Sequence, residues 1–150
     1  VQFPAYSGEK AFILSLPGNE SPPRIESSLL FERTIRELDL GSTKLVVLSA
    51  CESAPGAAGG AGTVPGLAGA FYTAGAGSVV ATIWPIEDRG ASIMTTALYR
   101  EIIDGGAHPA EALAGIQRRM IAEDRASGNP LSRIHIWAPY IVLSSLGPAR

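Results

Sequence analysis

The sequence has little cysteine and little histidine, and this scarcity excludes several kinds of site. There is one cysteine, Cys51, and there are two histidines, His108 and His135. One cysteine cannot form an internal disulfide, and these three residues do not make a Cys/His zinc motif. The sequence therefore predicts no metal and no cofactor. A chain without disulfides suits a reducing compartment, and we expect a cytoplasmic protein.

An excess of positive charge is also absent. The chain has 12 lysines and arginines against 14 aspartates and glutamates, with a net charge of -2. Nucleic-acid binding relies on a basic surface, so nucleic acid is not an expected partner. The glycine-rich stretch 56–62 lacks both the Gly-Lys-Ser/Thr ending of a P-loop and the dinucleotide spacing, which counts against a phosphate-binding protein.

A membrane-spanning helix is not expected, although residues 53–86 carry no charge. Pro55, Pro65 and Pro85 interrupt this stretch together with many glycines, so a loop, a buried helix and a buried strand explain it better. The amino terminus has no signal-peptide pattern. With 150 residues, 46% of them hydrophobic, the chain matches one globular domain.

Apolar patterns alternate between strand and helix along the chain. Short apolar runs predict strands at 11–16, 44–50, 78–84 and 137–146, and helical spacing predicts helices near 30–38, 64–74, 88–102 and 109–120. Such an alternation predicts an α/β fold of three layers, with a mostly parallel sheet between helices.

Cys51 directly follows the predicted strand 44–50 and precedes the glycine-rich stretch. In sheets of this kind the reactive crevice lies outside the carboxyl ends of the strands, so a nucleophile is expected at this place. Position alone leaves a second interpretation open, in which the thiol is a small buried apolar group.

Four segments in order resemble the CHAT domain family of caspase-like cysteine peptidases, in the clan of caspases and separase. They are LVVLSACESAPG, GLAGAFYTAGAGSVVATIWPIED, YREIIDGGAHPAEALAGIQ and IWAPYIVL, spread between Lys44 and Leu143. The resemblance implies a caspase-like sandwich and a cysteine endopeptidase with Cys51 as nucleophile. It also implies that residues 1–150 are the carboxyl-terminal part of a single CHAT domain whose amino-terminal part is missing.

The implied mechanism uses a Cys-His dyad, and in caspase-like enzymes the histidine lies about 50 residues before the cysteine. No histidine occurs between Val1 and Cys51. The partner histidine is therefore expected upstream of Val1, and we expect little or no peptidase activity from the isolated chain. His108, before Pro109, is expected to cap a helix or face solvent, and His135 to have a surface or packing role.

Two acidic residues follow adjacent predicted strands and are candidates for substrate binding. Asp88 and Glu52 could face the crevice near Cys51, where a carboxylate would favour a basic residue before the scissile bond. Asp88 matches an acidic position of the family motif. Its alternative role is the N-cap of a helix that begins at Arg89, and for Glu52 a solvent-facing position is favoured.

A function of a different class stays open beside the peptidase. A non-catalytic CHAT-fold module that binds other proteins would keep the fold without needing a histidine. The expected partners are a protein or peptide substrate and, because CHAT domains often accompany helical repeats, a regulatory helical-repeat region in the parent protein.

Overall fold

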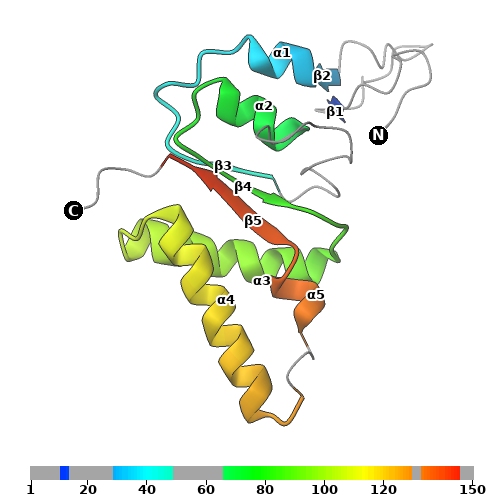
Figure 1. Cartoon of the computed structure of the whole chain (residues 1–150), viewed down its shortest axis with the longest axis vertical. Helices are drawn as coiled ribbons and strands as arrows, with labels where there is room; N and C mark the ends of the chain where they lie inside the picture. Colours follow the sequence, from blue (N-terminus) through cyan, green and yellow to red (C-terminus); the bar gives the residue numbers. More distant parts are fainter. Residues whose placement is uncertain (1–10, 14–28, 49–65, 130–132, 146–150) are drawn as a thin grey trace, which may run out of the picture.

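The structure is a computed structural model that describes residues 11–13, 29–48, 66–129 and 133–145. The elements in chain order are β1 (Ala11–Ile13), β2 (Leu29–Phe31), α1 (Glu32–Arg36), β3 (Val46–Val47), α2 (Leu67–Thr73), β4 (Ser78–Thr82), α3 (Asp88–Tyr99), the π-helical turn η3 (Arg100–Asp104), α4 (Pro109–Ala126), α5 (Ile134–Trp137) and β5 (Tyr140–Ser144). Figure 1 shows α1 and α2 on one side of the sheet β3–β5 and the other helices on the opposite side.

The main sheet of the described residues has β4 at its centre, between β3 and β5. β3 runs parallel to β4 and pairs Val46 with Val79. β5 runs antiparallel, so that Ser144 pairs with Ser78 at one edge and Tyr140 pairs with Thr82 at the other. β1 and β2 form a separate antiparallel pair.

β4 is buried along its whole length because apolar layers cover both of its faces. Side chains alternate between the faces of a strand, and the two layers follow this alternation. Val80 belongs to one buried cluster. Val79 and Ala81 belong to another, on the opposite face.

The thicker apolar layer joins the sheet to α3 and α4. Met94 and Leu98 of α3 and Ile116 of α4 are almost fully buried here, packed with Val80 and Tyr140. Truncating one such side chain to alanine costs about 2–5 kcal/mol in a typical core. This layer fixes the positions of both ends of α3 relative to the sheet.

The opposite layer is built from smaller side chains. Ala68 of α2 and Ala76 are buried against Val79 and Ala81, and Leu48 completes the cluster. Ile35 of α1 is fully buried against the outer side of α2, in a third cluster. Alanines at the contact let α2 lie close to the sheet, since there is little side-chain volume to separate them.

The helix predicted near 88–102 continues to Asp104, and its last turn is π-helical. The Gly105 amide donates to the carbonyl of Arg100, five residues earlier. A Cβ atom on Gly105 would lie 2.7 Å from the Glu101 carbonyl oxygen, so a residue with a side chain does not fit there without a backbone shift.

The predicted mixture of helices and strands is confirmed, but the prediction of a mostly parallel sheet is wrong for the described strands. One strand pair is parallel and one is antiparallel. One helix between two strands returns the chain to its starting edge, which gives a parallel pair. Two long helices, α3 and α4, lie between β4 and β5, so the chain enters β5 from the edge at which β4 ends.

Several element boundaries also differ from the prediction. The segment expected to begin a helix near Leu30 starts as strand β2, and Leu38 lies beyond α1 with 39% of its surface exposed. Trp137, expected in the last strand, ends α5. α4 continues to Ala126, well beyond the predicted end of that helix. Residues 14–16 and 49–50 of two predicted strands lie outside the described residues.

Candidate active site at the carboxyl edge of the sheet

The parallel pair β3–β4 defines one edge of the sheet where both strands end. Leu48, just beyond β3, donates its amide proton to the carbonyl of Val80 at 2.8 Å and so continues the ladder toward this edge. β4 ends at Thr82, and the Ile83 amide donates to the carbonyl of Pro139 at 2.9 Å. The carboxyl ends of β3 and β4 and the start of β5 therefore meet at one edge, called the carboxyl edge below.

Two of the predicted site residues, Cys51 and Glu52, lie outside the described residues. Leu48 is the last described residue before them and is buried, 8% exposed, at the carboxyl edge. Two residues, Ser49 and Ala50, separate it from Cys51 in the sequence.

Asp88, the third predicted site residue, is exposed and is the first residue of α3. Its alternative role as N-cap is wrong: the N-cap position is taken by Glu87, and no side chain caps this helix end. A carboxylate in the first turn is stabilised by the helix dipole without a capping bond. The Asp88 side chain is thus available at the surface next to the carboxyl edge.

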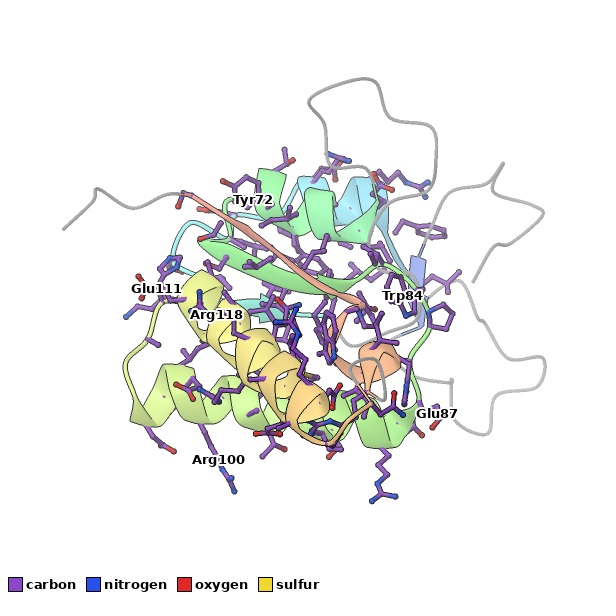
Figure 2. The ribbon with its side chains drawn as sticks, turned by 60° about the horizontal axis from the view of Figure 1, so that its bottom comes forward. Tyr72, Trp84, Glu87, Arg100, Glu111 and Arg118 are labelled. Carbon is purple, nitrogen blue, oxygen red and sulfur yellow. The ribbon has the colours of Figure 1, made fainter. Side chains whose placement is uncertain are left out.

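Figure 2 labels side chains at both ends of the sheet. Trp84 and Glu87 lie at one end of the sheet, and Glu111, in the first turn of α4, lies at the other. Trp84 is 40% exposed, as an aromatic at a pocket edge would be, whereas Trp137 packs partly buried against the core.

His108 has the predicted capping role. Its Nδ1 atom accepts the Ala110 amide proton at 3.4 Å at the start of α4, so in the neutral ring the proton is on Nε2. Nε2 faces the hydroxyl of Ser144 at 3.3 Å. A general base needs a proton-free nitrogen toward its nucleophile, so this arrangement is not that of a serine–histidine pair.

The position of His108 also separates it from the carboxyl edge. Its partner Ser144 is hydrogen-bonded to Ser78, the first residue of β4, at 2.9 Å between hydroxyl oxygens. Thr82 is the last residue of that strand. Four residue steps of a strand span about 13 Å, so His108 lies at the opposite edge of the sheet.

His135 is exposed on α5, which precedes β5 at the carboxyl edge. It therefore shares an edge with the end of β3. β4 lies between β3 and β5, however, and two strand spacings amount to about 10 Å.

A surface hollow of about 390 Å³ lies between α5 and the start of α3. Its lining residues come from the two sides, Glu87, Arg89, Gly90 and Ile93 on one and Arg133, His135 and Ile136 on the other. Ile93 is 40% exposed, which is unusual for a large aliphatic side chain on a packed helix. The neighbours of Asp88 on both sides in the sequence therefore line this hollow.

The α5 wall of the hollow is held by an ion pair that the sequence analysis missed. Arg133 Nε donates to Asp124 Oδ1 at 2.5 Å, and the Arg133 amide donates to Asp124 Oδ2 at 3.2 Å. Its terminal nitrogen Nη2 reaches Glu123 Oε2 at 2.9 Å and the Met120 carbonyl at 3.2 Å. The bonds to Asp124 and then Glu123 raise the pKa of Arg133 above its ordinary value.

The sequence spacing of its two residues does not indicate this ion pair, called the Arg133–Asp124 clamp below. The two residues are nine positions apart, which is not a helical spacing, and a turn separates them. Asp124 is 1% exposed on a helix face that its charge would normally keep in water. A lone acidic residue within an apolar stripe was the only signal.

Among the described residues no cluster of histidine, cysteine and acidic side chains could hold a metal ion. Within the same residues, no helix combines the length and the apolar character needed to cross a membrane.

The fold and this edge define an α/β domain whose candidate chemistry lies where two parallel strands end. The CHAT domain family matches residues 4–145, which is nearly the whole chain. The chain belongs to this family, as the motifs predicted. It is also 29% identical over 123 residues, 82% of its length, to tetratricopeptide repeat protein 28 of Mus musculus, and it spans 5% of that protein.

Proposed function

We propose that this chain is the nucleophile-bearing, carboxyl-terminal part of a CHAT-type cysteine endopeptidase domain that cleaves protein substrates. The observation that carries the proposal is the parallel pairing of β3 with β4, which brings the segments leading to Cys51 and to Asp88 to one edge of the sheet. Family membership over residues 4–145 supports it.

The chain length between Leu48 and Cys51 supports a thiol at this edge. Three residue steps span at most about 11 Å, so Cys51 cannot lie far from the end of β3. An apolar strand followed by a Ser-Ala-Cys sequence is where an α/β fold of this family would present a nucleophile.

In the proposed reaction the Cys51 thiolate attacks the scissile carbonyl carbon and forms a C–S bond while the carbonyl oxygen becomes an oxyanion. Backbone amides stabilise the oxyanion. The C–N bond then breaks, and an imidazolium gives its proton to the departing amine, which leaves a thioester. Water deprotonated by the same imidazole attacks the thioester, and the thiolate is released with the acid product.

The partner imidazole is proposed to come from a histidine encoded upstream of Val1. His108 is a poor candidate, because it is bonded at the opposite edge of the sheet, and in caspase-like enzymes the histidine lies about 50 residues before the cysteine, whereas His135 follows it. A reducing cytoplasm would keep the single thiol in its reactive form.

The substrate preference is proposed to be a basic residue before the scissile bond, bound by Asp88 with Glu52 as a second carboxylate. Asp88 is exposed, and no hydrogen bond or ion pair to another described residue occupies its carboxylate. In open solvent such a pair is weak, so the preference depends on the bound peptide excluding water from the carboxylate.

The experiment uses the parent protein with its upstream sequence and a library of matched peptides that differ in the residue before the cleaved bond. We expect cleavage after arginine and lysine, loss of cleavage in Cys51→Ala, and loss of the basic preference in Asp88→Asn. Cleavage that survives Cys51→Ala would refute the proposed nucleophile. A basic preference that survives Asp88→Asn would refute only its substrate role.

A second candidate function is a non-catalytic protein-binding module. The similarity to a protein named for its tetratricopeptide repeats favours it, because a domain beside repeats can serve in assembly, and it favours a regulatory helical-repeat region in the parent protein. The same library decides: absence of cleavage by a folded parent protein, with binding partners retained in Cys51→Ala, is the outcome this function predicts.

A further inference from the structure

The hollow between α3 and α5 takes no part in the proposed bond cleavage, yet it lies beside the proposed substrate site. Glu87 and Arg89, which line it, directly flank Asp88 in the sequence. Its volume of about 390 Å³ is within the usual range of ligand pockets, which is about 300–1,000 Å³. Asp88 itself does not line the hollow, and successive side chains of a helix point about 100° apart, so a peptide bound to its carboxylate would cross the first turn of α3 to reach the hollow.

The floor of the hollow is apolar. Ile93 of α3 and Ile136 of α5 present aliphatic side chains, and Gly90 between them has none. The position of a Cβ atom on Gly90 lies 3.5 Å from Ile136 Cγ1, so a single methyl group there would touch the opposite wall. The missing side chain at Gly90 is thus part of what keeps the hollow open.

The charges at the rim are mixed, and this argues against a charged occupant. Glu87 is acidic, whereas Arg89 is basic. The second arginine of the hollow, Arg133, is already ion-paired with Asp124 and Glu123. An anion would meet Glu87 and a cation would meet Arg89, but a neutral aliphatic side chain meets no like charge.

The shape of the hollow is fixed before any ligand binds. The Arg133–Asp124 clamp anchors the start of α5 to α4, and Ile136 packs against the core. A rigid wall lowers the entropy lost on binding, because the residues that contact the ligand are already ordered.

We propose that this hollow is a subsite for an aliphatic side chain of the substrate, within two residues of the basic residue bound at Asp88. Successive residues of an extended peptide rise about 3.3 Å, so two of them cover about the 5.4 Å pitch of the first turn of α3, which carries both Asp88 and lining residues of the hollow. The inference rests on the proposed peptidase function, since it assumes a peptide lying along the carboxyl edge.

The test measures peptide binding apart from cleavage. The parent protein with Cys51→Ala is titrated by fluorescence anisotropy with arginine-containing peptides that carry leucine or alanine at each of the two positions on either side of the arginine. At one position the leucine peptide is expected to bind about tenfold more tightly than its alanine counterpart. Ile93→Glu and Gly90→Ala should reduce this ratio to about one.

Ile103→Glu is the matched control, because Ile103 is 72% exposed on η3 and does not line the hollow. It should leave the leucine-to-alanine ratio unchanged. Gly90→Ala should not unfold the protein, since alanine favours a helix more than glycine does and the unfolding temperature should not fall. A lower leucine-to-alanine ratio in this variant would therefore reflect the hollow and not a loss of folding. Equal binding of both peptides by the unmutated site, or a ratio that survives both hollow variants, overturns the subsite.

The two proposals can fail separately. Leucine-dependent binding without cleavage of any peptide by the protein with Cys51 intact would support the subsite and refute the peptidase. Cleavage after arginine with no aliphatic preference at any neighbouring position would refute the subsite and leave the peptidase standing.

Discussion

Arg133 and Asp124 join the end of α4 to the start of α5 through two hydrogen bonds, from Nε at 2.5 Å and from the backbone amide at 3.2 Å. Asp124 is 1% exposed, and hydrogen bonds from Arg133 take the place of water at its carboxylate. The pair sets where α5 begins, and with it the wall of the hollow beside Asp88.

The clamp predicts a large stability loss when one partner is removed. Arg133→Ala should lower the free energy of unfolding by about 1.5–3 kcal/mol, because it removes the charge-assisted hydrogen bond from Nε to the buried Asp124 carboxylate. Urea denaturation of the parent protein measures this. Arg125→Ala, on the exposed side of the same helix, is the control and should change stability by less than about 0.5 kcal/mol.

The double variant Asp124→Leu/Arg133→Ala should recover part of the loss, since an apolar side chain replaces the buried carboxylate. A double variant that is less stable than Arg133→Ala alone would show that the carboxylate has other, more important contacts.

Substitution by alanine should have opposite effects on stability at two glycines, one within α3 and one directly after η3. Gly90→Ala should raise the free energy of unfolding by roughly 0.5–1 kcal/mol, because the added methyl fits at 3.5 Å and alanine favours a helix. Gly105→Ala should lower it by about 1–3 kcal/mol, because its Cβ would lie 2.7 Å from a backbone oxygen. Thermal and urea unfolding check both, and the same sign at both positions would contradict the described backbone.

We expect substitution of His108 to lower stability without lowering the rate of catalysis. His108→Ala removes the side-chain cap of α4 and should cost about 0.5–2 kcal/mol, whereas His108→Asn should keep most of it. His135→Ala, at an exposed position, should cost little. In the active parent protein, kcat should be unaffected by His108→Ala. A large fall in kcat at unchanged stability would mean that His108 acts in the chemistry.

The buried Tyr140 should make the free energy of unfolding decrease at alkaline pH. Burial raises the pKa of Tyr140 above its ordinary value, and a smaller effect of Thr95 opposes this. The pKa of Tyr140 is higher in the folded state than in the unfolded state. The buried, protonated phenol therefore makes its full contribution to stability below the unfolded-state pKa near 10. That contribution is lost as the pH rises toward the folded-state pKa.

Urea unfolding between pH 8 and pH 11 measures this dependence. Stability should fall above about pH 10, and Tyr140→Phe should make the fall shallower. Tyr72→Phe, at an exposed tyrosine, is the control and should not change the slope. An unchanged slope in Tyr140→Phe would contradict the burial of the phenol.

The sequence allowed the long helices and the family to be predicted well. Met94, Leu98, Leu113 and Ile116 recur at helical spacing within the helices predicted near 88–102 and 109–120, and they are buried against the sheet. Local periodicity suffices here because each helix has one apolar face. The four motifs in order were likewise enough to identify the CHAT family.

The direction of β5 and the clamp were not predicted, for physical reasons. The direction of a strand depends on how often the chain crosses the sheet. The apolar patterns between β4 and β5 predict two helices, but they do not show the path that the chain takes through them. The pairing of Arg133 with Asp124 depends on the tertiary path of the turn between them. No local pattern encodes such a contact, so the hollow beside Asp88 was also missed.

The central claim is that Cys51 reacts at the carboxyl edge with a peptide that carries a basic residue. The most direct measurement is alkylation of the parent protein by peptidyl chloromethyl ketones ending in arginine or in aspartate, followed by intact mass and peptide mapping. The account predicts a single adduct on Cys51, formed about tenfold faster with the arginine reagent, and no adduct in Cys51→Ala. Equal, slow labelling by both reagents, at the rate of an ordinary exposed thiol, would contradict it.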